Sequence, residues 1–138
     1  MNDTMKLELS NWMKDYSKIN YNEDWKLCVD LTYKWKVKTD KVCRKWLGNL
    51  KNYLSENDIN IDGFFVTEYD KNFTNLHNHL LVWSSDSWSN TQSKIFNYWK
   101  RIGSLNISKY DVNSNYTEYM TKYIGRERYN SWDLISNI

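Results

Sequence analysis

The alternation of apolar and polar residues along the chain predicts a series of short helices and strands. Apolar residues recur at period two in residues 25–35, at three- and four-residue intervals in residues 40–54 and 87–99, and in short runs at residues 61–69 and 76–83. Period two and short apolar runs are typical of strands, and the longer spacing is typical of a helix with one buried face. The central part of the chain is therefore predicted to run strand, helix, strand, strand, helix.

One further strand and a helix at each end complete the predicted order. Residues 4–18 have apolar side chains at helical spacing, and residues 103–112 form the next strand. Asn115 can cap a last helix in which Glu118 completes a capping box, and Gly125 lies where a left-handed cap would end it. This order predicts an α+β fold: an antiparallel sheet of four or five strands with flanking helices, related to ferredoxin-like and RNA-recognition (RRM) folds.

Length and composition are those of one globular domain. The chain has 138 residues, of which 41% are hydrophobic, and it contains no internal repeat and no low-complexity linker. We expect a single domain over residues 1–138. Residues 1–24 would be an N-terminal helical extension, and residues 25–128 would be the core that carries the chemistry.

Charge and hydropathy narrow the class of protein only a little. The formal net charge is +2, which neither requires nor excludes a polyanionic partner. No segment approaches the roughly 20 apolar residues that cross a bilayer, and the N-terminus lacks the apolar segment of a signal peptide. We expect a cytoplasmic protein without a membrane partner, in which Cys28 and Cys43 are reduced, buried thiols.

His77 and His79 are the two histidines of the chain, and they lie in one apolar strand. Side chains at i and i+2 of a strand share a face, so both imidazoles can bind one divalent ion. A hairpin about residues 70–75 would bring Glu68 close enough to supply an oxygen ligand. This donor set suits Mn²⁺ or Mg²⁺ with open positions for a phosphate oxygen. Two alternatives stay open: Asp70, one residue out of phase, as the acid, or histidines that bind no metal.

Tyr119, Lys122 and Tyr123 share one face of the last predicted helix, because they lie at positions i, i+3 and i+4. A phenol has a pKa of about 10, so a nearby cation such as Lys122 would favour the nucleophilic phenolate or shield a scissile phosphate. The structural alternative also stays open. Tyrosines at helical spacing commonly pack in a core, and a neighbouring lysine commonly extends along apolar surface to solvent.

Together these motifs resemble the HUH endonuclease superfamily, particularly the rolling-circle replication initiators (Rep proteins) of viruses, phages and plasmids. The resemblance covers most of residues 26–128. It includes an early strand of the form Asp30-Leu31-Thr32-Tyr33, the histidine strand, and the segment Tyr119-x-x-Lys122-Tyr123. One departure is Asn78 between the histidines, where the family usually has a bulky hydrophobic residue. The Asn78 side chain points to the opposite face of the strand, so ligation by the histidines is not affected.

The resemblance implies an HUH nuclease fold and a metal-dependent DNA endonuclease and strand transferase. Mn²⁺ or Mg²⁺ on Glu68, His77 and His79 would polarise the scissile phosphate of single-stranded DNA or an origin hairpin. Tyr119 would attack this phosphate to give a 5′-phosphotyrosine and a free 3′-OH that can prime synthesis. Reversal of the step would rejoin the strand. For Tyr123, a role as second nucleophile and a packing role stay open.

The predicted DNA contacts are basic residues around the site: Lys100, Arg101, Lys109, Lys122, Arg126 and Arg128. An exposed subset of the tryptophans could stack on bases. In contrast, the lysines at the end of the first strand (Lys34, Lys36, Lys38 and Lys41) are equally well explained as solvated charge. The host replication machinery is the other implied partner, and a homodimer is left open.

Two rival interpretations accompany the replication initiator. A single-tyrosine HUH transposase would use the same chemistry, although Lys122 three residues after the tyrosine favours the initiator. A non-catalytic single-stranded nucleic-acid-binding protein of the RRM type would use aromatic residues of the sheet, but its Lys/Arg-Gly-Phe-x-Phe run is missing from the chain.

Overall fold

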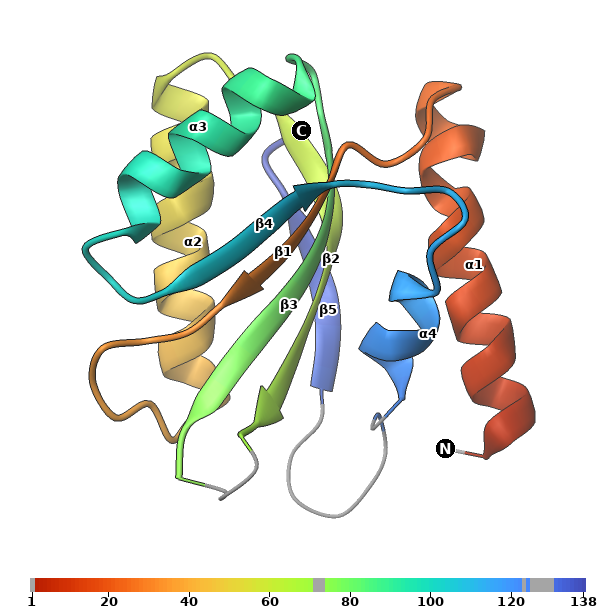
Figure 1. Cartoon of the computed structure of the whole chain (residues 1–138), viewed down its shortest axis with the longest axis horizontal. Helices are drawn as coiled ribbons and strands as arrows, with labels where there is room; N and C mark the ends of the chain where they lie inside the picture. Colours follow the sequence, from red (N-terminus) through yellow and green to blue (C-terminus); the bar gives the residue numbers. More distant parts are fainter. Residues whose placement is uncertain (1, 71–73, 123, 125–130) are drawn as a thin grey trace.

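A computed structural model of the chain describes residues 2–70, 74–122, 124 and 131–138. In this part of the chain, one antiparallel sheet lies between helices on both of its faces (Figure 1). The helices are α1 (Asp3–Tyr21), α2 (Asp40–Glu56), α3 (Trp88–Trp99) and α4 (Tyr116–Thr121). The strands are β1 (Leu27–Leu31), β2 (Ile61–Tyr69), β3 (Leu76–Ser84), β4 (Leu105–Lys109) and β5 (Ser131–Ser136).

The sheet has the strand order β4-β1-β3-β2-β5, and every neighbouring pair is antiparallel. The first four strands, with α2 and α3 as crossovers, have the ferredoxin-like arrangement. The predicted α+β fold is confirmed. The fifth strand lies on the outer edge of β2, in a segment for which the sequence pattern predicts no element.

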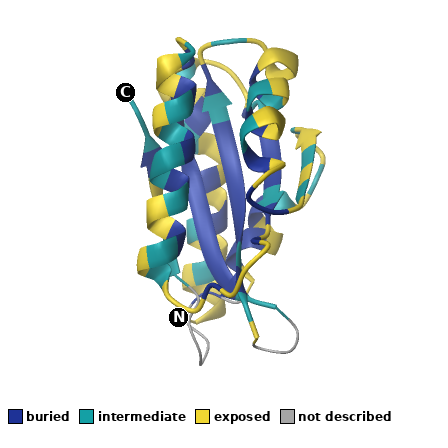
Figure 2. Cartoon of the chain, turned by 90° about the vertical axis from the view of Figure 1, so that its left-hand side faces the viewer, coloured by how far each residue is buried: buried dark blue, intermediate teal, exposed yellow. Residues whose placement is uncertain are grey.

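Two cores fill the spaces between the sheet and its helices. Leu27, Val29 and Leu31 of β1 belong to the core under α2 and α3. Phe64 of β2 and Leu81 of β3 belong to the second core, under α1 and α4. The central strands are therefore buried on both faces, whereas the helices expose their outer sides (Figure 2).

β1 is shorter than the predicted strand over residues 25–35, because the chain turns away at the point where β4 ends its pairing. Leu31 is paired with Leu105, and beyond it the Thr32 amide donates to the Ser104 carbonyl at 3.0 Å. Gly103 allows this close approach: a Cβ atom there would lie 1.9 Å from the Thr32 carbonyl oxygen. The turn at Gly103 is therefore a packing requirement as well as a chain reversal.

α1 is packed against the rest of the molecule along its length. Met13 is fully buried in the second core, and the Ser10 hydroxyl donates to the Thr117 hydroxyl of α4 at 3.0 Å. The Lys6 ammonium donates to the Lys122 carbonyl at the end of α4 at 3.1 Å. The segment predicted as an N-terminal extension therefore supports α4 directly.

α4 begins at the predicted position but without the predicted capping box. Asn115 occupies the cap position, and its side chain makes no capping hydrogen bond. Gly125, the predicted C-terminal cap, lies outside the described residues. Isolated helices of this length are unstable in water, so α4 depends on its contacts with α1 and the sheet.

Two further expectations concern the chain as a whole. Cys28 and Cys43 are buried free thiols, as predicted. Among the helices that the structure describes, none is both long enough and apolar enough to span a membrane.

Candidate active site

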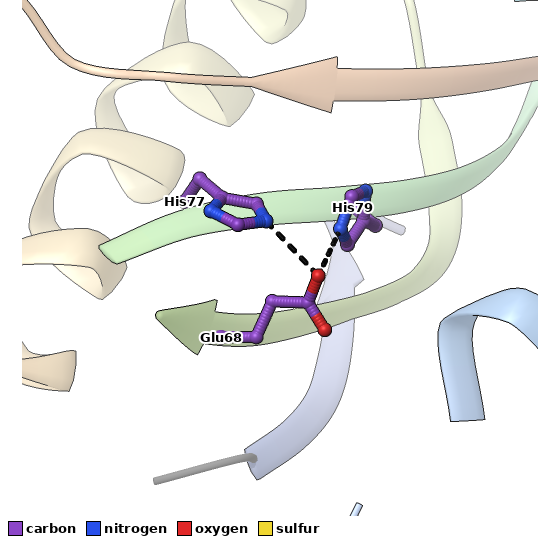
Figure 3. Close-up of side chains that lie close together, drawn as sticks. All are labelled: Glu68, His77 and His79. Atoms are coloured by element: carbon purple, nitrogen blue, oxygen red, sulfur yellow. Dashed lines mark hydrogen bonds and ion pairs between the residues drawn. The ribbon is translucent and has the colours of Figure 1, made fainter. Parts of the chain in front are cut away.

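Glu68, His77 and His79 converge on one point of the sheet (Figure 3). The β2–β3 hairpin pairs Glu68 directly with His77, and His79 follows on the same face of β3. His77 Nε2 and His79 Nε2 donate to the same oxygen, Glu68 Oε1, at 2.9 Å and 2.6 Å. One potential ligand atom from each residue lies within 4.8 Å of the others, so the three can hold a metal ion. The donor set of one carboxylate and two imidazoles fits a divalent cation.

The charges of this cluster are mutually stabilised. Burial alone would raise the pKa of Glu68, but the hydrogen bonds from His77 and His79 outweigh it and lower the pKa to about 2. Burial would lower the pKa of His79, but hydrogen bonds to Asp30 and Glu68 raise it to about 9. The carboxylate is therefore ionised at neutral pH, as a metal ligand must be, and a bound ion would replace the protons on the imidazoles.

Asp70, the alternative acid, has a different role. Its carboxylate accepts hydrogen bonds from the Thr74 amide at 2.9 Å and the Thr74 hydroxyl at 2.8 Å. These bonds close the turn that leads into β3. Among the described residues, Glu68 is the acid that groups with the two histidines.

Asp30 holds the second nitrogen of His79 in place. The Asp30 carboxylate accepts from His79 Nδ1 at 2.6 Å, because β1 pairs Asp30 with His79 across the sheet. This bond orients His79 Nε2 toward the cluster, as carboxylates behind metal-binding histidines do in other proteins.

Sequence reasoning placed Asp30 in the early strand but gave it no role. The available signal was an acid at the centre of an apolar strand. Its neighbours Val29 and Leu31 point into the core under α2 and α3, so strand alternation directs Asp30 to the other face of the sheet, where the histidines lie.

Tyr116 connects α4 to the same acid. Its hydroxyl donates to Asp30 Oδ1 at 3.0 Å and lies 3.2 Å from the Val29 carbonyl. Burial, and then the charge of Asp30, raise the pKa of Tyr116 well above its usual value. Tyr116 is therefore held as a neutral donor. Sequence spacing did not single it out, because its role depends on how α4 packs against β1.

Tyr119 lies beside the histidines and is open to solvent. Its ring centroid is 5.0 Å from that of His79, in an edge-to-face arrangement, and 49% of the residue is exposed. The phenol is therefore presented next to the ligand cluster, on a side of α4 that a DNA strand can reach.

The other predicted site residues are distributed more widely. Lys122 is exposed at the C-terminal end of α4, whereas Tyr123, Arg126 and Arg128 lie outside the described residues. Lys100 and Arg101 are exposed at the end of α3, and Lys109 lies over the ring of Trp88 at 5.4 Å. These three belong to the α3 side of the sheet, on the opposite face from the ligand cluster. Their contact with DNA remains a prediction.

Asn78 is fully buried behind the histidines, in polar surroundings. Its side-chain oxygen accepts from the Tyr33 hydroxyl at 2.6 Å, and its amide donates to the Thr67 hydroxyl at 2.9 Å. These partners satisfy an amide at a position where the superfamily usually has a hydrophobic residue.

A comparison with protein families identifies the chain. The model of the family Replication-associated protein ORF2 matches residues 26–128. The chain belongs to this family. The match includes the ligand cluster, Asp30 and α4, and it associates them with DNA replication. No significant match was found among curated proteins or among solved structures.

Proposed function

We propose that this replication-associated protein is an HUH-type endonuclease that initiates rolling-circle replication by nicking and rejoining single-stranded DNA at an origin. The observation that carries the proposal is the position of Tyr119 beside His79, next to three residues that can hold a metal ion. The family match to replication-associated proteins favours an initiator over a transposase.

Tyr119 is the proposed nucleophile. Its oxygen forms a bond to the scissile phosphorus while the bond from phosphorus to the 3′ oxygen breaks. The phenol loses its proton, the leaving 3′ oxygen gains one, and the products are a 5′-phosphotyrosine and a free 3′-OH. Attack by a 3′-OH on the phosphotyrosine reverses these changes and rejoins the strand. No nucleotide cofactor is needed, because the phosphotyrosine conserves the phosphodiester bond energy.

The exposure of the two nearby phenols supports Tyr119 over Tyr116. Tyr119 is half exposed, whereas the Tyr116 hydroxyl is engaged by Asp30 and its pKa is raised. A phenol that donates to a carboxylate is a poor source of phenolate, because its ionisation would place two negative charges together. Tyr116 is better suited to hold α4 against the ligand strand.

Glu68, His77 and His79 would bind Mn²⁺ or Mg²⁺, which when bound supplies Lewis-acid polarisation of the scissile phosphate. Asp30 keeps His79 Nε2 directed at the cluster. Lys122 would shield the charge that develops on the phosphate. Single-stranded DNA or an origin hairpin would be the substrate, and the host replication machinery would extend the free 3′ end.

The test is the formation of a covalent complex between the protein and labelled single-stranded oligonucleotides in the presence of Mn²⁺. We expect a slowly migrating band under denaturing conditions that Tyr119→Phe removes. His77→Ala and His79→Ala should each abolish cleavage, whereas Tyr123→Phe should only weaken joining. A wild-type protein that binds DNA but forms no adduct would instead support a non-catalytic binding protein, and an intact band in Tyr119→Phe would refute the assigned nucleophile.

A further inference from the structure

A second feature lies at the same end of the sheet as the ligand cluster: two neighbouring tryptophans surrounded by lysines. Trp35, in the loop between β1 and α2, is 40% exposed. Its ring centroid is 5.1 Å from that of the partly buried Trp46 on α2. The lysines around them are Lys34, Lys36, Lys38, Lys41 and Lys45, all of which are exposed. We call these seven residues the tryptophan–lysine platform.

The platform is attached to the strand that carries the histidines. The Asn75 side chain donates to the Trp35 carbonyl at 3.1 Å and accepts from the Val37 amide. The Leu76 amide donates to the Val37 carbonyl at 2.9 Å. Asn75 precedes His77 by two residues, which is about 7 Å along a strand. Figure 1 shows the loop after β1 at the end of the sheet where β3 begins. The platform is thus fixed close to the ligand cluster.

The charge of the platform is not neutralised by the protein. Among the described residues, none of its five lysines forms an ion pair. The acid at the start of α2, Asp40, is instead paired with Arg44. The Lys45 ammonium lies 6.0 Å from the centre of the Trp46 ring. An exposed indole beside unpaired ammonium groups fits a ligand with both aromatic rings and negative charges.

We propose that the platform binds a single strand of DNA, with bases stacked on Trp35 and phosphates held by the surrounding lysines. Single-stranded nucleic acids present both of these groups at every nucleotide, and proteins bind them through stacking aromatic residues in a basic setting. The further statement that the bound strand continues to the scissile phosphate rests on the proposed nuclease function. The binding itself does not.

The test measures binding separately from cleavage. Fluorescence anisotropy would follow a labelled oligo-dT of about 20 nucleotides, long enough for sites of this kind, with the full chain carrying Tyr119→Phe so that no adduct forms. Trp35→Ala should weaken binding about tenfold, because the stacking of one base contributes an effect of that order. Trp35→Phe should restore most of the affinity, which separates stacking from damage to the loop.

Trp88 provides a matched control. It is 38% exposed and also has a lysine over its ring, Lys109 at 5.4 Å, but it lies at the start of α3 and outside the platform. Trp88→Ala should leave the affinity unchanged. Unchanged binding in Trp35→Ala, or an equal loss in Trp88→Ala, would overturn the proposal.

The lysines are tested through the salt dependence of the same binding. Lys34→Gln with Lys36→Gln should reduce the slope of log affinity against log salt by about 1.4, since each phosphate contact to a single strand contributes about 0.7. Lys14→Gln with Lys94→Gln, on α1 and α3, should not change it. An unchanged slope in the first pair would remove the lysines from the platform.

The two proposals can fail independently. A protein that forms the adduct while Trp35→Ala binds normally retains its nuclease function and loses the platform. A protein that forms no adduct but depends on Trp35 for binding retains the platform and loses the nuclease function.

Discussion

At the scale of single residues, the site depends on which nitrogen of His79 faces the ligand cluster. Asp30 determines this, since it accepts a hydrogen bond from Nδ1 and leaves Nε2 directed at Glu68. The same carboxylate accepts from Tyr116. A single, partly buried acid therefore connects the ligand strand to the helix that carries Tyr119.

Asp30→Asn tests this role. The amide is nearly the same size but carries no charge, so we expect Mn²⁺ affinity and the cleavage rate to fall about 10- to 100-fold. Isothermal titration with Mn²⁺ would measure the affinity. Asp24→Asn removes the same charge at an exposed position paired with Lys18 and should have no effect. Equal Mn²⁺ affinity in Asp30→Asn and the parent would contradict a positioning role.

The ligand cluster could be predicted from the sequence, whereas the residues behind it could not. Glu68, His77 and His79 follow from strand periodicity and one short hairpin, which are local features. Asp30 and Tyr116 are brought to the site by the pairing of β1 with β3 and by the packing of α4. Such long-range contacts have no signature in residue spacing.

At the scale of elements, β3 carries polar side chains on both of its faces near the site. The histidines point to the α4 side, and Asn78 points into the α2–α3 core, where Tyr33 and Thr67 satisfy it. A buried hydrogen-bonded network of this kind costs little when complete and much when one partner is lost.

Asn78→Leu should therefore destabilise the protein although leucine is more apolar. The buried hydroxyls of Tyr33 and Thr67 would lose their partner, and we expect the free energy of unfolding to fall by about 1–3 kcal/mol. Adding Tyr33→Phe removes one of these stranded hydroxyls and should recover part of the loss. Urea unfolding measures both variants. An Asn78→Leu protein as stable as the parent would show that the network contributes nothing.

Most elements could be predicted from periodicity because they have one clear buried face. β5 could not, since of its six residues only Ile135 is buried. It is a strand because the edge of β2 offers hydrogen-bond partners. α4 likewise takes its short length from contacts that capping patterns do not encode.

At the scale of the whole molecule, α1 closes the second face of the sheet and supports α4. Its far end is held at Asp62 of β2, a buried carboxylate that accepts from the hydroxyls of Tyr16 and Tyr21. Burial, and then the hydrogen bond and charge of Asp62, raise the pKa of Tyr16 to about 12 and raise that of Tyr21 further.

This clamp predicts a loss of stability at alkaline pH. The Tyr16 phenol holds its proton more tightly in the folded protein than in the unfolded chain, where its pKa is about 10. Its contribution is therefore complete below about pH 10 and is lost as the pH rises toward about 12. Urea midpoints across this range should fall more for the parent than for Tyr16→Phe with Tyr21→Phe. Parallel curves would contradict the clamp.

The most direct test of the nuclease account is to locate the nucleotide on the protein after reaction with single-stranded DNA and Mn²⁺. Trypsin releases residues 110–122 as one peptide, with Tyr110, Tyr116 and Tyr119, and separates them from Tyr123. Tandem mass spectrometry of the nuclease-trimmed adduct should place the nucleotide on Tyr119. A nucleotide on Tyr116 or Tyr123 instead, or on no tyrosine, would contradict the account.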